Sequence, residues 1–131
     1  MTMPLPLLQE KEIDAAIRIM IVEDEAIVAE SLNDQLIELG YEICGMADSG
    51  EDALSLADSL DPDLVMMDIR LAGKMDGVET AERLHRKSDI PVIYLTAYSD
   101  KETLERAKIT QPFGYLVKPY KERELHTTIE V

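Results

Sequence analysis

Five short apolar blocks, separated by amphipathic stretches, constrain the fold of this sequence more than any other feature. The blocks are Ile17–Val22, Tyr41–Ala47, Leu64–Met67, Pro91–Leu95 and Gly114–Val117. Short apolar runs that alternate with helices are typical of parallel strands that are covered on both faces. The pattern therefore predicts an α/β fold with a doubly wound, five-stranded parallel sheet and five helices.

Between and after the blocks, apolar side chains recur at the spacing of an α-helix. In Ala26–Leu39 the apolar side chains recur on one helical face, and Gly40 follows as a residue suited to ending a helix. Further helices are predicted over Ser49–Ser59, Asp76–Lys87, Asp100–Ile109 and Lys121–Val131. Asp100 is expected to cap the fourth of the five helices, because aspartate is a favoured N-cap residue.

The chain length suits a single domain. Residues 17–131 are interpreted as that domain, since a chain of 131 residues can bury enough apolar surface to fold around one core. Residues 1–16 are interpreted as an N-terminal extension, in which the polar stretch Gln9–Ala16 has helical potential.

Composition excludes several classes of function. The net charge of −14 argues against direct nucleic-acid binding, which needs clustered Lys and Arg. No apolar run reaches the roughly 18 residues of a membrane span, and the first residues lack the pattern of a secretory signal, so we expect no membrane association and a cytoplasmic location. Cys44 is the single cysteine, which excludes an intrachain disulfide, and we expect it to pack as a small hydrophobe.

Chemically complementary side chains follow four of the five blocks. They are Glu23, Asp24 and Glu25 after the first block, Asp68 after the third, Thr96 and Ala97 after the fourth, and Lys118 after the fifth. The carboxyl ends of parallel strands share one edge of the sheet, where sites form in open α/β folds. Clustered carboxylates suit Mg²⁺, and a lysine ammonium suits an anion. The set indicates phosphoryl transfer to an aspartate, with an acyl phosphate as the product.

Simpler interpretations exist for each residue alone. Asp24 or Glu25 could serve only as a helix N-cap, Thr96 could cap a turn, and Lys118 could be an ordinary loop lysine. Their joint placement on one edge of the sheet favours a site over four unrelated local roles.

Five motifs carry a family resemblance. They read VEDE at Val22–Glu25, MMDIRL at Met66–Leu71, MDGVE at Met75–Glu79, YLTAYSD at Tyr94–Asp100 and FGYLVKPY at Phe113–Tyr120. In this order and spacing the sequence resembles the receiver domain of two-component response regulators, from about Arg18 to the end of the chain. The resemblance is strongest to receivers fused to sensor-kinase or PAS modules. It implies a flavodoxin-like sheet with the strand order 2-1-3-4-5.

The resemblance also implies a role for each motif residue. Asp68 would be the phospho-acceptor, and Mg²⁺ would be held by Glu23, Asp24, Asp68 and the backbone carbonyl of Arg70. The phosphoryl oxygens would be contacted by Thr96, Lys118 and the backbone N–H of Ala97. Thr96 and Tyr115 would form the switch, and Lys118–Pro119 would be a cis peptide bond.

The sequence departs from the commonest receiver pattern near the acceptor. The loop after Asp68 is one residue longer than in single-domain chemotaxis regulators, with Ala72 where proline is usual. Arg70 and Tyr98 stand two residues after Asp68 and Thr96, at positions that tune phosphorylation and hydrolysis rates in this family. We expect both side chains to screen attacking water and to prolong the phosphorylated state.

The resemblance further implies how the signal enters and leaves. A histidine kinase or phosphotransfer protein would supply the phosphoryl group and dock over Asp68 at the start of the first helix. Ile27 faces away from the apolar stripe of that helix, so it could contact this donor or could simply pack at the edge. Thr96 and Lys118 would be drawn to the new anion, and Tyr115 would turn inward. The surface of Asp100–Ile109, Gly114–Val117 and Lys121–Val131 would then signal to a downstream effector or a fused domain. The resemblance also allows a homodimer.

Two other functions remain open from the residues. A Mg²⁺-dependent phosphatase with an aspartyl-phosphate intermediate would usually place a D-x-D pair after the first strand, where this chain has Glu23–Glu25. A flavodoxin-like binding module would need a phosphate cradle at that point, and the same acidic residues would repel phosphate. Of these readings, a non-enzymatic phospho-acceptor agrees best with the sequence.

Overall fold

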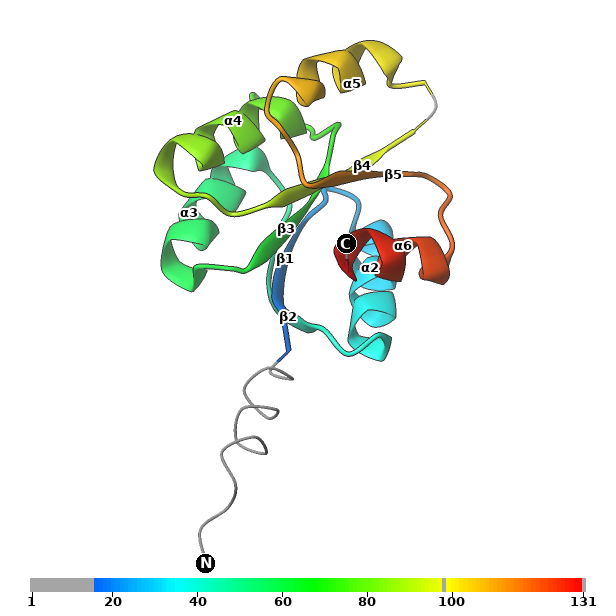
Figure 1. Cartoon of the computed structure of the whole chain (residues 1–131). Helices are drawn as coiled ribbons and strands as arrows, with labels where there is room; N and C mark the ends of the chain where they lie inside the picture. The colour runs from blue at the N-terminus through cyan, green and yellow to red at the C-terminus, as the bar shows by residue number, and fades with distance from the viewer. Residues whose placement is uncertain (1–15, 98, 131) are drawn as a thin grey trace, which may run out of the picture.

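A computed structural model describes residues 16–97 and 99–130, and in this part of the chain it contains one five-stranded sheet (Figure 1). The strands are β1 (Arg18–Val22), β2 (Glu42–Ala47), β3 (Leu64–Asp68), β4 (Val92–Thr96) and β5 (Gly114–Val117). All paired strands are parallel, and their order is β2-β1-β3-β4-β5. The predicted doubly wound sheet, with flavodoxin-like order 2-1-3-4-5, is confirmed.

Helices follow each strand within the described residues. They are α2 (Ala26–Glu38), α3 (Gly50–Leu60), α4 (Gly77–Lys87), α5 (Lys101–Lys108) and α6 (Glu122–Glu130). Each boundary of a strand or helix lies within one residue of the predicted one. The predicted helix over Gln9–Ala16 falls almost wholly outside the described residues, as does Val131. No helix among the described residues has both the length and the apolar character to cross a membrane.

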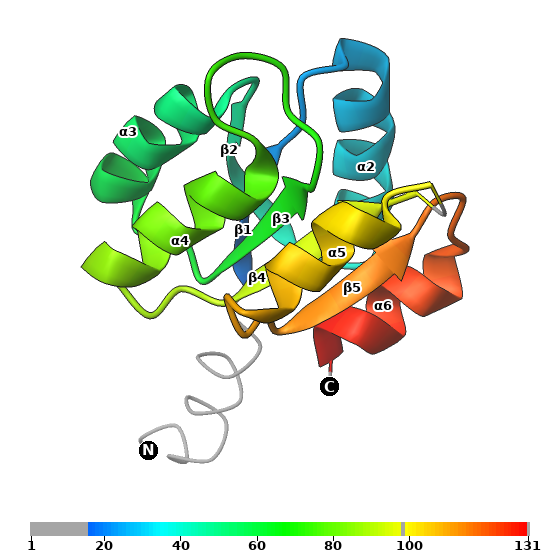
Figure 2. The ribbon, with the colours of Figure 1, turned by 90° about the horizontal axis from the view of Figure 1, so that it is seen from above.

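The sheet separates two apolar cores. On one face α2 and α6 cover alternate strand residues such as Ile19 and Ile21, and on the other face α3, α4 and α5 cover the intervening ones, such as Met20 and Val22 (Figure 2). This alternation follows from the two-residue side-chain period of a strand. The three central strands β1, β3 and β4 are therefore buried on both faces, as expected.

The edge strand β2 departs from the expected burial. Glu42 and Met46 are exposed, and Cys44 is only half-buried, although it packs against the core beside α3. An edge strand has a neighbour on one side only, so fewer side chains can cover it. Burial raises the pKa of the Cys44 thiol, which agrees with a packing role rather than a reactive one.

The long loop between β3 and α4 is fixed at both of its ends. The backbone N–H of Ala72 donates to the Asp24 carboxylate at 3.0 Å. Gly73 adopts a φ of 102°, which a residue with a side chain would adopt only under strain. Asp76 caps α4, because its carboxylate accepts a hydrogen bond from the backbone N–H of Glu79.

Gly77, the first residue of α4, lies against the acceptor strand. A Cβ added there would stand 2.1 Å from the carbonyl oxygen of Asp68 and 2.9 Å from the Cα of Ile69. Both of these are backbone atoms that cannot rotate away. The residue type at position 77 therefore controls where the end of β3 lies.

We predict that Gly77→Ala destabilises the protein by about 1–3 kcal/mol, the range for overpacking a tight contact. Urea unfolding followed by circular dichroism measures the difference. Arg83→Ala, on the exposed face of the same helix, is the control and should change stability by no more than about 0.5 kcal/mol. Equal stability of Gly77→Ala and the natural sequence would contradict the close packing described above.

Candidate functional site

The acidic segment after β1 forms one side of the site. Glu23 is buried, with 3% of its surface exposed, and its backbone N–H donates to the carbonyl of Ala47. Its carboxylate accepts a hydrogen bond from the backbone N–H of Glu25 at 3.1 Å. Glu25 precedes α2 without capping it through its side chain, and Asp24 instead accepts from Ala72, so neither of them acts as a side-chain cap of α2.

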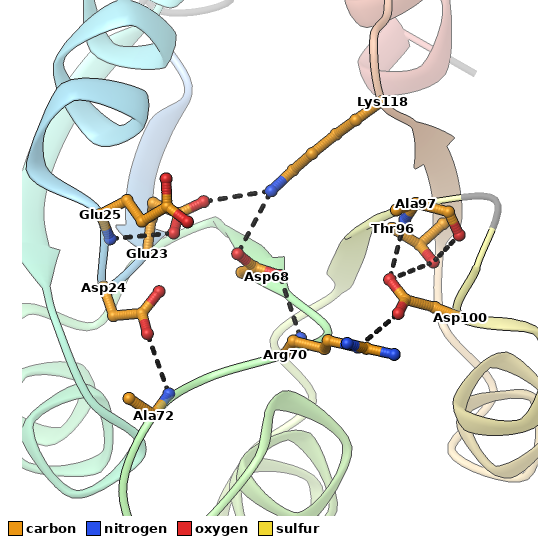
Figure 3. A network of polar contacts seen from close by, with 10 residues as sticks. All are labelled: Glu23, Asp24, Glu25, Asp68, Arg70, Ala72, Thr96, Ala97, Asp100 and Lys118. Carbon is orange, nitrogen blue, oxygen red and sulfur yellow. Dashed lines mark hydrogen bonds and ion pairs between the residues drawn. The ribbon is translucent and has the colours of Figure 1, made fainter.

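Asp68 ends β3 at the centre of the same edge. One carboxylate oxygen accepts from the backbone N–H of Arg70 at 3.0 Å. The other lies 3.2 Å from the ammonium nitrogen of Lys118, which is also 3.3 Å from a carboxylate oxygen of Glu23 (Figure 3). The structure thus brings the predicted acceptor, one of the predicted metal ligands and the predicted anion-binding lysine into direct contact.

Charge in this cluster is only partly balanced. Burial, followed by the hydrogen bond to Asp68, raises the pKa of Glu23 to about 7, against the opposing effect of Lys118. Burial alone would lower the pKa of Lys118, but the neighbouring carboxylates of Asp68 and Glu23 outweigh it and raise that pKa. The neighbouring carboxylates therefore favour the charged ammonium of Lys118, whereas burial favours the protonated form of Glu23.

Three carboxylates are close enough to share a cation. Oxygen atoms of Glu23, Asp24 and Asp68 all lie within 4.8 Å of one another. Asp24 and Asp68 line an open pocket of 370 Å³, together with Lys118 and Arg70. Hard oxygen donors on one side of an open, hydrated pocket fit Mg²⁺, which binds through a few carboxylates and retains several waters.

The end of β4 forms the other side of the pocket. Thr96 is buried, and its hydroxyl lies within hydrogen-bond distance of the carbonyl of Ala97, at 3.3 Å, and of the Asp100 carboxylate, at 3.4 Å. The backbone N–H of Ala97 donates to the same Asp100 oxygen at 2.9 Å. The polar groups of Thr96 and Ala97 thus contact Asp100 rather than Asp68. Tyr98 lies outside the described residues.

Asp100 shows where the sequence analysis was incomplete. It precedes α5, as predicted, but its side chain makes no capping hydrogen bond, so the expected cap was wrong. Its carboxylate turns back to Ala97 and also forms an ion pair with Arg70. The only signal in the sequence was an acidic residue in the segment that follows Thr96, and that signal fitted a helix cap equally well.

Tyr115 lies one strand away from the pocket. It pairs in register with Tyr94, and the two rings stack with centroids 6.2 Å apart. The side chain is half-buried, and burial raises its pKa. Lys118–Pro119 is a cis peptide bond, as the resemblance implied.

Comparison with known proteins identifies the family. Residues 19–130 match the family model described as the response regulator receiver domain. The chain belongs to this family. As a receiver domain it is a phospho-acceptor switch module of two-component signalling, and neither the phosphatase nor the flavodoxin-like alternative is favoured.

Solved receiver structures resemble this receiver over most of its length. The signal receiver domain of a modulated diguanylate cyclase from Desulfovibrio desulfuricans G20 is 45% identical, with a TM-score of 0.83, and the match covers 88% of this chain and 91% of that one. The N-terminal domain of a response regulator/sensory box/GGDEF 3-domain protein from Carboxydothermus hydrogenoformans is 35% identical, with a TM-score of 0.78, over 86% of this chain and 90% of that one.

A curated relative is longer than this receiver. The transcriptional regulatory protein PdtaR of Mycobacterium tuberculosis is 39% identical over 120 residues, which cover 90% of this chain and 58% of the relative. The chain spans about half the length of the curated relatives that it matches.

The raised pKa of Glu23 predicts a pH-dependent stability. Between about pH 4.5 and 7 the folded receiver holds a proton that the unfolded chain has already lost, so the stability that is fully present below about pH 4.5 is lost as the pH rises through about 7. Glu23→Gln, which is neutral at every pH, should therefore be more stable than the natural sequence by about 1 kcal/mol or more near pH 8 without divalent cations.

Urea unfolding of both proteins across this pH range measures the effect. The stability advantage of Glu23→Gln should shrink toward about pH 5, where folded Glu23 is itself protonated. Glu25→Gln, at an exposed neighbouring position, controls for the change in net charge. An advantage that does not depend on pH would contradict the assignment of the buried proton to Glu23.

Proposed function

We propose that Asp68 accepts a phosphoryl group from a phosphohistidine of a histidine kinase or phosphotransfer protein. The observation that carries this proposal is the position of its carboxylate, which lies within 4.8 Å of two further carboxylates and contacts the ammonium of Lys118. The transfer breaks the phosphorus–nitrogen bond of the donor, whose imidazole leaves with the electron pair. A carboxylate oxygen of Asp68 forms the new bond to phosphorus, which gives an acyl phosphate.

Mg²⁺ is the proposed cofactor. Asp24 and Asp68 would bind it directly, Glu23 largely through water, and the backbone carbonyl of Arg70 would complete the protein ligands. When bound, the ion neutralises charge on the phosphoryl oxygens during transfer. The cluster of three carboxylate oxygens within 4.8 Å supports this assignment.

The chain's own groups orient the acceptor and receive the new charge. The backbone N–H of Arg70 fixes one oxygen of Asp68 through its hydrogen bond. Lys118 would follow the phosphoryl group as a mobile cation, and Thr96 and the N–H of Ala97 would donate to its other oxygens. Arg70, Ala97 and Lys118 line the same pocket as Asp68, and Thr96 directly precedes Ala97, which supports their assignment.

We propose that the switch couples this pocket to the surface of α5, β5 and α6. Movement of Thr96 toward the phosphoryl group would open space that Tyr115 can fill, because Tyr115 is half-buried on the adjacent strand. A shift of a two-state equilibrium from 1:99 to 99:1 needs about 5.5 kcal/mol of differential stabilisation. The changed surface would then be recognised by an effector, a fused domain or a second copy of this chain.

Arg70 and Tyr98 remain our proposed tuning residues. The Arg70 side chain extends to Asp100 in the structure, so screening of water at Asp68 would require it to swing back (Figure 3). We propose that both side chains slow hydrolysis of the acyl phosphate by limiting the approach of water, as the pattern at their positions predicts.

The proposed donor would dock at the start of α2. Ile27 is 82% exposed there and lines a largely apolar depression of 380 Å³ with Pro119 and Tyr120, directly beside Lys118.

We propose that the receiver comprises residues 17–131, works in the cytoplasm where such kinases supply phosphoryl groups, and contacts neither nucleic acid nor membrane itself. We further propose that it catalyses no reaction beyond its own phosphorylation and dephosphorylation.

Acetyl phosphate with Mg²⁺ should add the mass of one phosphoryl group to the intact protein, as measured by mass spectrometry. Asp68→Asn should remove the modification, because an amide cannot form the acyl phosphate. Chelation of Mg²⁺ should also prevent it. Modification that persists in Asp68→Asn would overturn the proposed acceptor.

A matched control is Asp63→Asn, at an exposed position on the loop before β3. It should be modified like the natural sequence. Sustained release of phosphate from small phosphorylated substrates would favour the phosphatase alternative instead.

A further inference from the structure

Asp100 is the buried charged residue for which the mechanism above has no role. It is 4% exposed, and its side chain leaves the N–H groups of α5 without a side-chain cap. It lines the same pocket as Asp68. A carboxylate in that position must be held by specific donors, since an unpaired buried charge is strongly destabilising.

The donors that hold Asp100 are the ones that the phosphoryl group needs. One Asp100 oxygen accepts from the backbone N–H of Ala97 at 2.9 Å and lies 3.4 Å from the hydroxyl of Thr96. A carboxylate and a phosphoryl group are both anions that accept hydrogen bonds from such donors. One N–H cannot be fully shared between two anions, so binding of one weakens binding of the other.

Arg70 holds the second Asp100 oxygen. Its guanidinium forms an ion pair with Asp100, while its backbone N–H donates to Asp68 (Figure 3). A single residue therefore contacts both the acceptor carboxylate and Asp100. The Arg70 side chain is 67% exposed, which leaves it free to move when its partner moves.

We propose that Asp100 is an internal competitor of the phosphoryl group, a proposal that rests on the proposed function of Asp68. The Asp100 carboxylate occupies the Ala97 N–H and the Thr96 hydroxyl, and Arg70 holds it there. Phosphorylation of Asp68 displaces it from both donors. Asp100 thus opposes the binding of a phosphoryl group to the Ala97 N–H and the Thr96 hydroxyl, and lowers the affinity of the site for that group.

The displaced carboxylate has a second set of donors nearby. The first N–H groups of any helix have no partners within the helix, and aspartate at the N-cap position is well suited to accept from them. Asp100 occupies that position of α5. Its release would therefore stabilise the start of α5, which links the exchange at Ala97 to the surface that we propose as the output.

The test uses beryllofluoride with Mg²⁺, which imitates a phosphoryl group on a carboxylate. The apparent Kd is measured by NMR titration of the natural sequence, Asp100→Asn and Glu102→Gln. Asp100→Asn should bind at least about threefold more tightly, since a charge-assisted competitor becomes a weaker neutral one. Without beryllofluoride, the same variant should shift the Ala97 amide resonance.

Glu102→Gln is the matched control. It removes one negative charge from the first turn of the same helix, at an exposed position, and within the described residues the side-chain partner of Thr96 and Ala97 is Asp100 instead. Its Kd and its Ala97 resonance should stay close to those of the natural sequence. An equal gain in both variants would mean that only net charge matters, and would overturn the competition.

Arg70→Gln gives an independent test if Asp100→Asn does not fold. If Arg70 acted only as a cation beside an anion site, Arg70→Gln would weaken beryllofluoride binding. If Arg70 instead holds Asp100 on the donors, Arg70→Gln should tighten beryllofluoride binding. Equal or weaker beryllofluoride binding by the folded variants would overturn this inference alone. Failure of the natural sequence to bind, or undiminished binding by Asp68→Asn, would overturn the proposed function and this inference with it.

Discussion

The ammonium of Lys118 is the interaction on which the site depends. Two largely buried carboxylates, Glu23 and Asp68, lie close together at one edge of the sheet, and like charges in such a setting repel each other strongly. Lys118, which directly follows β5, contacts both of them. The parallel order of the strands makes this contact possible, because residues adjacent in space are about fifty or more positions apart in the chain.

The proposed site would have a cation-binding side and an anion-binding side, with Asp68 between them. Glu23 and Asp24 offer carboxylate oxygens, and Thr96 and Ala97 offer donors (Figure 3). Phosphoryl transfer needs both kinds of group, because the transferred group is itself an anion that a metal must neutralise. In the structure these donors are engaged by the carboxylate of Asp100, and the proposed competition with a phosphoryl group rests on that contact.

Most of the fold could be predicted from the sequence because it depends on local periodicity. The central strands are short apolar runs, and the helices carry regular apolar faces, so all observed boundaries lie within one residue of the predicted ones. The predicted acidic cluster and Lys118 also meet as expected. The exposure of β2 and the side-chain partners of Asp100 were missed, because both depend on tertiary position. Arg70 and Asp100 are thirty residues apart in the sequence, so no local sequence pattern could predict their ion pair.

The close packing of Gly77 bears on the direction in which the proposed signal would travel. The backbone of α4 lies against the end of β3 with no space for even one methyl group, so the acceptor strand and this helix must move as a single body. The segment after β4 is instead held by exchangeable polar contacts at Ala97. A chemical event at Asp68 would therefore meet close backbone packing toward α4 and exchangeable polar contacts toward α5, which agrees with the proposed output surface of α5, β5 and α6.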